Sequence, residues 1–342
     1  MVRKLAKTSP SNIPPEIIEI ILSKLSSVKS LLRFKAVSKS WNTIISDPLF
    51  IQNHLQSSNN LFLRRNITDR GFPLVKLEGG KIHTEGISVE NIPNGYNVIL
   101  CDCNGVLLLT DRCRVNKYAL WNPSTRWERH LKTRYKDYVV DHGICYDKIT
   151  DDFKVIFIFA TKYAIYSCNN DSWTRKKLRA RYRNTGLTLC FDPKTDELKV
   201  LQKPEQLSDS EKYVLGYNMA SLRGSLCLYG YNYLENSVHI WIKEKGIDVG
   251  NNSNTNWKEF LTVGNFRASS MWFTQLCFVE NKVVFQEKSI RFVSSETTVE
   301  ESLWIDAYGG RFIPYRNSLY FPTGVKTKTI KAQQSSLILT LD

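Results

Sequence analysis

Residues 12–51 constrain the fold of this chain more than any other stretch. Ile17, Ile20, Ile21 and Leu25 recur at three- and four-residue spacing, which is the period of an apolar stripe along a helix. A unit of about forty residues has little interior, so it cannot bury every apolar side chain that this stretch carries. The stretch therefore predicts a small helical unit that either packs on its own core alone or presents an apolar face to another protein.

Local signals predict three short helices within this stretch. The first begins at Pro14-Pro15, because a first helical turn tolerates the missing N–H group of proline. Ser27 can cap the second helix by accepting a hydrogen bond from a free backbone N–H group. The third ends before Asp47-Pro48, since the residue before a proline avoids the helical region.

The same stretch resembles an F-box of the plant type. The resemblance rests on Ile13-Pro14, on VKSLLRF from Val28 to Phe34, and on VSKSW from Val37 to Trp41, in the order and spacing of the family. It implies binding to a Skp-type adaptor and, through it, to a cullin scaffold in an SCF-type ubiquitin ligase. By this resemblance, the residues that face the adaptor or set the helix packing that presents it are Pro14, Ile17, Ile21, Leu25, Leu31, Val37 and Trp41.

The rest of the chain is strand-like and contains an internal repeat. Residues 145–156 (CYDKITDDFKVI) match residues 190–201 (CFDPKTDELKVL) position by position, and residues 120–128 (LWNPSTRWE) form a shorter copy. Each copy has a strand ending in an aromatic residue, then a turn opened by Asp or Asn, whose side chain can accept hydrogen bonds from backbone N–H groups just downstream. The two long copies are 45 residues apart, and such a period points to about six propeller blades, with a β-sandwich pair as the competing architecture.

Most of residues 97–330 resembles the F-box-associated domain of plant F-box proteins. The resemblance is carried by CNGVLLLTDR, HGICYDKITDDFKVIFI and SLRGSLCLYGYN, which follow one another in the order of the family. One strand of the family pattern is missing, because the basic run at residues 175–183 leads almost directly into residues 187–192. The expected fold class is α+β multidomain, with a three-helix F-box followed by an all-β, kelch- or propeller-like domain.

The chain of 342 residues is long enough for two domains. The expected parts are a flexible N-terminus at 1–10, the F-box at 11–55, a linker and first strands at 56–96, the F-box-associated β domain at 97–330, and a C-terminal strand or tail at 331–342. No secretory signal or membrane span is expected. Eight cysteines without a C-x-x-C pair are typical of reduced thiols, which indicates a cytoplasmic or nuclear protein.

The net charge of +14 is concentrated most strongly at residues 175–183. Within this run, Arg179, Arg181 and Arg183 would suit a phosphate group on a target protein. The run can equally be a solvated loop between strands, a surface that steers an acidic partner, or a nuclear import signal. Nucleic-acid readers interleave aromatic side chains along a basic groove, and Tyr182 alone is thin support for that function.

The sequence contains no recognisable catalytic pattern. Its five histidines are scattered without the spacing of a metal site, so no metal or cofactor is expected. His142 and Cys145 fall on a predicted strand at a spacing of three, which places them on opposite faces. The carboxylate pairs Asp151-Asp152 and Asp196-Glu197 recur at equivalent repeat positions, which indicates a role in turns.

These observations predict a non-catalytic substrate-recognition subunit of an SCF-type ubiquitin ligase. The helices would dock the adaptor, and the β domain would recruit a target protein for ubiquitination. The alternative is a basic β-domain module that binds nucleic acid or an acidic protein without a role in a ligase. In the first case, the resemblance supplies a role for the chain without naming the target protein.

Overall fold

The computed structural model describes residues 13–57, 61–64, 71–78, 81–83, 88–89, 92–133, 135, 137–179, 188–201, 214–222, 225–243, 257–264, 276–279, 282–286, 290–294, 300–303, 312–321 and 337–340. The helices come first, and every strand pairing that follows is antiparallel. The helices are α1 (Pro15–Ser23), α2 (Val28–Phe34), α3 (Lys39–Ile45) and α4 (Pro48–Ser57).

The first two helices begin where the sequence predicts. Helix α1 has a proline at its first position, and helix α2 is capped by Ser27, whose Oγ accepts a hydrogen bond from the Ser30 N–H group at 3.3 Å. Helix α3 is capped in the same way by Ser38. Local hydrogen bonds of this kind therefore set the boundaries of the helical unit.

The prediction of three helices is wrong by one, because Asp47-Pro48 both ends α3 and starts α4. The Asp47 Oδ1 atom accepts hydrogen bonds from the N–H groups of Leu49 at 2.8 Å and Phe50 at 3.1 Å. Pro48 occupies the first position of the new helix, where its missing N–H group leaves no bond unmade. A proline that stops one helix can thus open the next.

Within the described residues, the strands form six antiparallel sheets. Their orders are β23-β1-β2-β3 with β4 beside β2, β5-β6-β7-β8, β12-β11-β10-β9, β14-β13-β24, β15-β16-β17-β18 and β19-β20-β21-β22. The strands are β1 (Leu61–Arg64), β2 (Phe72–Glu78), β3 (Lys81–His83), β4 (Ser88–Val89), β5 (Val98–Cys103), β6 (Val106–Asp111), β7 (Arg114–Asn122), β8 (Trp127–Leu131), β9 (Asp141–Asp147), β10 (Asp152–Ile158), β11 (Lys162–Ser167), β12 (Ser172–Lys177), β13 (Thr188–Asp192), β14 (Glu197–Val200), β15 (Val214–Leu222), β16 (Ser225–Asn232), β17 (Ser237–Lys243), β18 (Trp257–Val263), β19 (Leu276–Val279), β20 (Lys282–Gln286), β21 (Ile290–Ser294), β22 (Glu300–Leu303), β23 (Phe312–Tyr315) and β24 (Leu337–Thr340).

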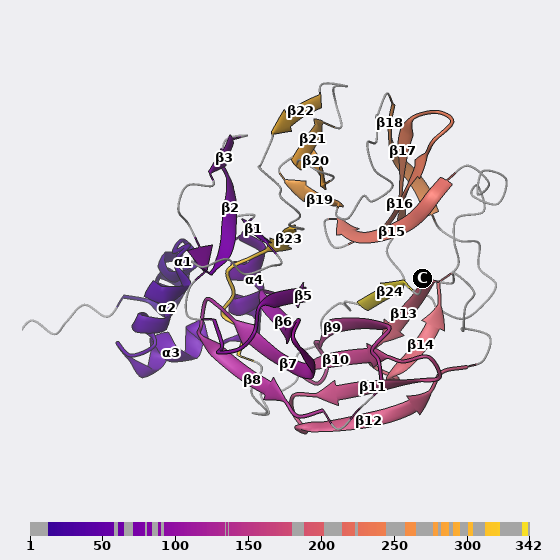
Figure 1. Ribbon diagram of the computed structural model, residues 1–342. Coiled ribbons are helices and arrows are strands. Elements are labelled where there is room, and N and C mark those ends of the chain that lie inside the picture. Colours follow the sequence, from indigo (N-terminus) through magenta and orange to yellow (C-terminus); the bar gives the residue numbers. More distant parts are fainter. Residues whose placement is uncertain are drawn as a thin grey trace, which may run out of the picture.

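The sheets follow one another around a common centre, with the helices on one side of the molecule (Figure 1). Strand β5 contacts both β23 and β9, β24 contacts both β9 and β15, and β15 contacts β19. Neighbouring sheets therefore meet through the strands nearest the centre. The number of described sheets agrees with the six units that the 45-residue period predicts.

Two late strands complete early sheets. Strand β23 pairs with β1, with Leu61 opposite Tyr315, so the first sheet is built from both ends of the β region. Strand β24 pairs with β13, with Leu189 opposite Leu339. The sheet that contains β13 is the one whose preceding strand is missing from the sequence pattern, and β24 lies on that side of it.

The core of the β region lies between adjacent sheets. All seven residues of β10 are buried, because this strand is covered on both faces. On one side Val155 and Phe157 join a cluster with residues of β6 and β7, and on the other Ile156 and Ile158 join a cluster with residues of β13 and β14. Burial on both faces explains why β10 is continuously apolar apart from its first residue, Asp152, and Lys154.

Turns between strands share one hydrogen-bonding pattern, as the repeat predicts. The Asp or Asn that opens each turn accepts a hydrogen bond through its Oδ1 atom from the backbone N–H group two residues ahead, at 2.9 to 3.0 Å. These pairs are Asn122 with Ser124, Asp147 with Ile149, Asp192 with Lys194, and Asn232 with Leu234.

The last turn residue before the next strand adopts a left-handed backbone. It is Asp151 (φ 50°), Asp196 (φ 55°) or Asn236 (φ 50°) in three of these turns and Arg126 (φ 60°) in the fourth. Asp171 (φ 47°) takes the same position in the turn between β11 and β12. Asp and Asn tolerate this conformation better than other residues with a Cβ atom. In three turns a tyrosine five residues earlier donates a hydrogen bond to the Asp or Asn side chain: Tyr146 to Asp151, Tyr166 to Asp171, and Tyr231 to Asn236.

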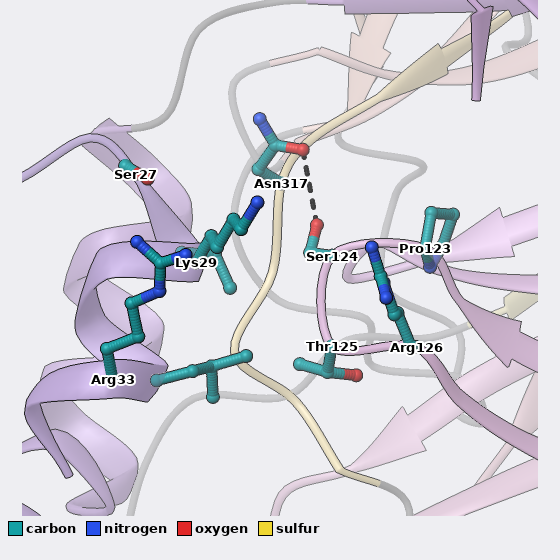
Figure 2. Close-up of a pocket in the computed structure, with 10 residues that line it drawn as sticks. Ser27, Lys29, Arg33, Pro123, Ser124, Thr125, Arg126 and Asn317 are labelled. Atoms are coloured by element: carbon teal, nitrogen blue, oxygen red, sulfur yellow. Dashed lines mark hydrogen bonds between the residues drawn. The ribbon is translucent and has the colours of Figure 1, made fainter. Parts of the chain in front are cut away.

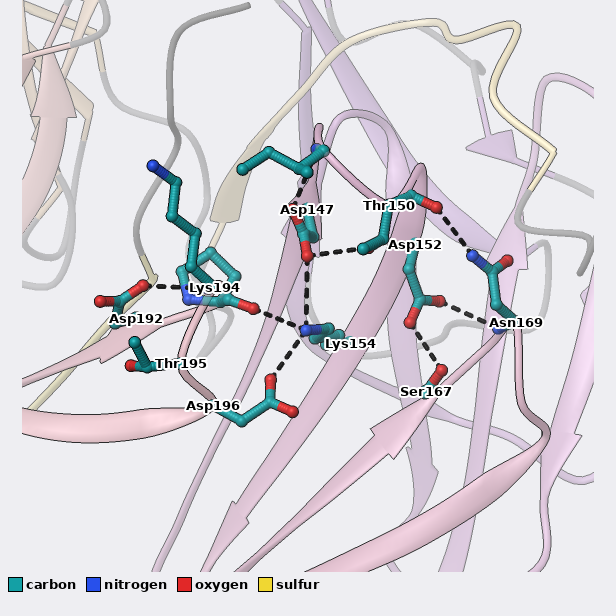
Figure 3. A network of polar contacts seen from close by, with 12 residues as sticks. Asp147, Thr150, Asp152, Lys154, Ser167, Asn169, Asp192, Lys194, Thr195 and Asp196 are labelled. Atoms are coloured by element: carbon teal, nitrogen blue, oxygen red, sulfur yellow. Dashed lines mark hydrogen bonds and ion pairs between the residues drawn. The ribbon is translucent and has the colours of Figure 1, made fainter. Parts of the chain in front are cut away.

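A buried lysine joins two of these turns (Figure 3). The Lys154 Nζ atom donates to the Asp196 Oδ1 atom at 2.7 Å and to the Pro193 carbonyl at 2.6 Å, and lies 3.4 Å from the Asp147 Oδ2 atom. Burial alone would lower the pKa of Lys154, but the hydrogen bond and the charges of the two carboxylates raise it. The repeat places Lys199 at the equivalent position, where its Nζ atom donates to Asp192 at 2.8 Å.

Residues 315–321, here named the strap, connect the helical unit to the sheets. The Asn122 Nδ2 atom donates to the carbonyls of Ser318 at 3.1 Å and Tyr320 at 2.9 Å. Leu319, which lies between these two residues, is fully buried among side chains of the four helices. Gly105 has φ 75°, and a Cβ atom there would lie 2.4 Å from the Arg316 carbonyl, so only glycine fits under the strap. The strap therefore packs against both the helices and the sheets.

Candidate functional site

Helix α1 is apolar on two faces, and within the described residues one of them packs against the rest of the chain. Leu22 is fully buried, and Ile18 and Leu25 pack against the same helical core. Ile17 and Ile20 point elsewhere and keep 46% and 55% of their surface exposed. Since the core is already filled by the first face, the second face is free to meet another molecule.

Exposed large apolar side chains also occur in the helical unit outside α1. We define the helical apolar face as the large apolar residues of the helical unit that are at least 46% exposed: Ile13, Ile17, Ile20, Ile21, Val37 and Leu49. A concentration of this kind on a small unit marks an interaction surface more often than isolated exposed side chains do.

The residues predicted to contact or present the adaptor fall into two groups. Pro14, Ile17, Ile21 and Val37 are exposed, so their side chains are accessible to a partner. Leu25 and Trp41 are partly buried and Leu31 is fully buried, which makes them part of the helix packing. Trp41 packs edge-to-face on Phe34 with the ring centroids 5.4 Å apart.

Sequence reasoning missed residues in both groups. Ile18 and Leu22 supply the inward face of α1, while the exposed Ile13, Ile20 and Leu49 extend the outward face. A helical period signals that the apolar residues gather on faces, but α1 has apolar residues on more than one face, so the period alone does not say which one is inside.

The basic run lies on an outer strand. Strand β12 is at the edge of its sheet and exposes Arg175 and Lys177, and Arg179 is exposed just after it. The Arg175 guanidinium lies over the ring of Tyr135, 4.6 Å from its centroid. Arg181 and Arg183 lie outside the described residues, so the three predicted arginines are not seen together.

The side chains considered for chemistry are occupied in structural roles. Burial raises the pKa of the Cys145 thiol, so this group stays protonated near neutral pH. Asp152 accepts hydrogen bonds from Ser167 at 2.6 Å and from the Asn169 N–H group at 3.0 Å, while burial raises its pKa.

In the part of the chain that the structure describes, no cluster of three or more histidine, cysteine or acidic side chains is arranged to hold a metal ion. Among the same residues, no helix has both the length and the apolar character needed to cross a membrane.

Comparisons with known proteins match two separate parts of the chain. A family model described as F-box-like matches residues 10–56, and a model described as F-box associated beta propeller domain matches residues 78–188. The first match contains the helical apolar face, and the second contains the sheets that include β5 to β12. Residues 10–56 are thus similar to F-box-like domains, and residues 78–188 are similar to F-box associated beta propeller domains.

The homologues are F-box proteins of Arabidopsis thaliana. An F-box/kelch-repeat protein is 28% identical over 193 residues, which cover 50% of this chain and 51% of that protein. An F-box protein is 26% identical over 296 residues, which cover 73% of this chain and 74% of that protein. The chain spans about half the length of the first of these relatives.

Among solved structures, the Nidogen/Laminin complex is similar at a TM-score of 0.38 and 11% identity, covering 72% of this chain and 94% of that chain. A likeness of this size carries no argument about the fold or the function.

Proposed function

We propose that this chain is a substrate-recognition subunit of an SCF-type ubiquitin ligase. Its helical apolar face would bind a Skp-type adaptor and, through it, a cullin, while its sheets would hold a target protein. The observation that carries this proposal is the second apolar face of α1, which lies within the residues that match the F-box model. The chain itself would be non-catalytic and would act by proximity, because holding two reactants together raises their effective concentration.

The energetics favour an apolar partner at this face. Ile17, Ile20 and Ile21 each keep about half of their surface exposed, and covering such a side chain contributes about 1 kcal/mol. Three neighbouring isoleucines and Val37 together supply the apolar centre of an interface without any change in the helical core. The strap would hold this interface at a set orientation to the sheets.

For the β region we propose a closed ring of six propeller blades. Six sheets around one centre and contacts between their inner strands support this architecture. Pairing of β23 with β1 would close the ring, because strands from both ends of the β region then share one sheet. The proposed domains are the F-box at 11–55 and a β domain that extends beyond the expected 97–330, because β1 to β4 and β24 belong to the six sheets.

We propose that the target protein is held near β12. Arg175, Lys177 and Arg179 make this edge basic, which suits an acidic or phosphorylated segment of a target. The protein would work in the cytoplasm or nucleus, where ubiquitin ligases of this class find their targets.

Adaptor binding is tested with a double variant in the exposed face of α1. Ile17→Asp with Ile21→Asp should weaken binding to a Skp-type adaptor at least about 100-fold, since two carboxylates would be buried without partners. Thermal unfolding should stay unchanged because both side chains are exposed. Leu31→Asp is unsuitable, since Leu31 is fully buried and its replacement would unfold the helices.

The matched controls are Ile149→Asp and Leu234→Asp. These residues are exposed to a similar degree, 44% and 59%, but lie in turns of the β region. Both variants should bind the adaptor like the unchanged chain. Full adaptor binding by the double α1 variant would refute the proposal. A chain that binds no adaptor but binds an oligonucleotide with a steep salt dependence would favour the basic-module alternative.

A further inference from the structure

A pocket of about 660 Å³ separates helix α2 from the turn between β7 and β8. Figure 2 shows Lys29 and Arg33 on the helix side, Ser124, Thr125 and Arg126 on the turn side, and Asn317 of the strap between them. Its volume is in the range of pockets that hold small molecules. The pocket therefore lies where the helical unit, the strap and the sheets come together.

The charged groups around this pocket all have the same sign. Lys29, Arg33 and Arg126 line it, and no lining residue is acidic. Within the part of the chain that the structure describes, none of these three cations forms an ion pair with a carboxylate. Three cations around one pocket repel one another, so an anion that enters it relieves the repulsion.

Arg126 occupies a position where the turn pattern calls for another residue type. The equivalent left-handed positions in four other turns carry Asp or Asn, which suit that backbone and accept a local hydrogen bond in three of them. At φ 60° Arg126 has neither advantage. A strained residue that replaces a favourable one points to a role outside the turn itself.

The replacement changes the charge of the pocket. An aspartate at this turn position would neutralise one of the two helix cations, and an asparagine would leave the pocket with two. Arg126 instead adds a third cation on the side opposite the helix (Figure 2). Two independent observations therefore indicate an anionic ligand. All charged side chains that line the pocket are positive, and Arg126 departs from the residue type of the other turns.

We propose that this pocket binds a small phosphorylated anion with more than one negative charge. The two guanidinium groups can each form paired hydrogen bonds to phosphate oxygens, and Lys29 adds a third charge. Asn317 uses its Oδ1 atom to accept from Ser124 at 3.2 Å, which leaves its amide nitrogen to donate to a ligand. The Thr125 hydroxyl accepts from the Trp127 N–H group at 3.4 Å and can donate its own proton.

Such a ligand would bridge two parts of the molecule. It would be held by Lys29 and Arg33 from the helical unit and by Arg126 from the β region, and it would sit against the strap. Binding would add contacts that exist only when both parts are in their native arrangement, so it would stabilise the folded chain. The site does not depend on adaptor binding.

The test uses the full chain and inorganic pyrophosphate as the probe. Thermal unfolding and calorimetric titration should show that pyrophosphate raises the unfolding temperature and binds at least ten-fold more tightly than sulfate at the same ionic strength. Inorganic phosphate should bind between these two. Equal binding of pyrophosphate and sulfate would overturn the proposal, because it would reflect charge screening alone.

Variants separate the pocket from the overall basic charge. Arg126→Asn restores the residue type of the other turns, so the chain should fold at least as well while its affinity for pyrophosphate falls at least ten-fold. Lys29→Gln should also weaken binding. Lys194→Gln removes the same charge from an exposed position that does not line the pocket, and it should leave binding unchanged; an equal loss in this control would overturn the assignment to the pocket.

A phosphorylated peptide distinguishes a free ligand from a protein-borne phosphate. A phosphoserine peptide should bind more weakly than pyrophosphate, because it presents a single phosphate to three cations. If the peptide bound more tightly than pyrophosphate and lost affinity in Arg126→Asn, the site would be a phosphoprotein site and the small-anion assignment would be wrong.

Discussion

The turn before β8 and the turn before β10 have the same backbone design but treat positive charge in opposite ways. Asn122 and Asp147 open them with the same hydrogen bond, and Arg126 and Asp151 end them with the same left-handed backbone. Near the second turn the cation is Lys154, which is buried and surrounded by acceptors. Near the first turn the cations line an open pocket without a carboxylate.

The two turns show where a cation must be paired with a carboxylate and where it can stay unpaired. A buried ammonium group must be paired, because an isolated charge in a low dielectric is very unfavourable. Cations at a pocket open to water can stay unpaired, since the solvent screens their repulsion until an anion arrives. The same turn can therefore serve the fold in one place and leave a binding site in another.

Removing the buried cation, Lys154, should have the largest effect on the free energy of unfolding. Lys154→Met would leave Asp147 and Asp196 without their cation, and removal of one partner of a buried ion pair costs about 3–5 kcal/mol. Urea unfolding should show this loss. Lys177→Met on exposed β12 is the control, and a similar loss in both variants would contradict the pairing argument.

Cutting the link between the first turn and the strap should have the next largest effect. Asn122→Ala removes the turn hydrogen bond and leaves two buried carbonyls unpaired, for about 2–3 kcal/mol of lost stability. Asn232→Ala is the matched control. Asn232 opens an equivalent turn, and its hydrogen bonds in the described residues stay within that turn. Equal unfolding free energies for the two variants would mean that the Asn122 bonds to the strap contribute nothing.

The carboxyl group of Asp102, which lies next to the strap, should make the stability of the chain depend on pH. Burial raises the pKa of Asp102 to about 7, against the opposing charge of Arg316 and a hydrogen bond from the Gly105 N–H group. The folded chain thus holds this proton more tightly than the unfolded chain, in which the pKa is 3.8. The contribution of Asp102 to stability therefore decreases as the pH rises from that value through about 7.

Asp102→Asn should remove this decrease. At about pH 8 the variant should be more stable than the unchanged chain by about 1–2 kcal/mol, a figure reduced because the side chain keeps some contact with solvent. Near pH 4 the two chains should unfold alike. Chemical unfolding across this range is the measurement, and a difference that does not change with pH would contradict the assignment.

The smallest effect should come from making the two turns alike. Arg126→Asn should raise stability by about 1 kcal/mol, because asparagine tolerates the left-handed backbone better than arginine. The reciprocal change Asn236→Arg should lower stability, since it introduces the strain and removes the hydrogen bond from Tyr231. A loss of stability in Arg126→Asn would mean that the arginine contributes to the fold.

Much of the local structure could be predicted, because it depends on residues close in sequence. Ser27 caps α2 through Ser30, and Asp147 closes its turn through Ile149, as the patterns indicate. The fourth helix was missed because Asp47-Pro48 is a stop signal for one helix and a start signal for the next. Both readings are local, and the sequence pattern alone did not choose between them.

The candidate sites were predicted less completely. The apolar pattern of the helical unit did not separate its core from its surface: Leu31 is fully buried and Ile20 is exposed, although both are apolar. The pocket was not predicted at all. Arg126 differs from the Asp residues at its equivalent positions, and that departure within the repeat is the signal that could have found it.

The helical unit, the turns and the strands could be predicted from the amino-acid sequence, because they follow from hydrogen bonds and periodicities that span a few residues. The exposed face of α1 and the group of cations around one pocket result from tertiary packing. Those outcomes depend on contacts such as the one between Asn122 and Ser318, which are 196 residues apart. No local propensity encodes such a contact; it forms when the sheets come together around the core and bring the strap against the helices.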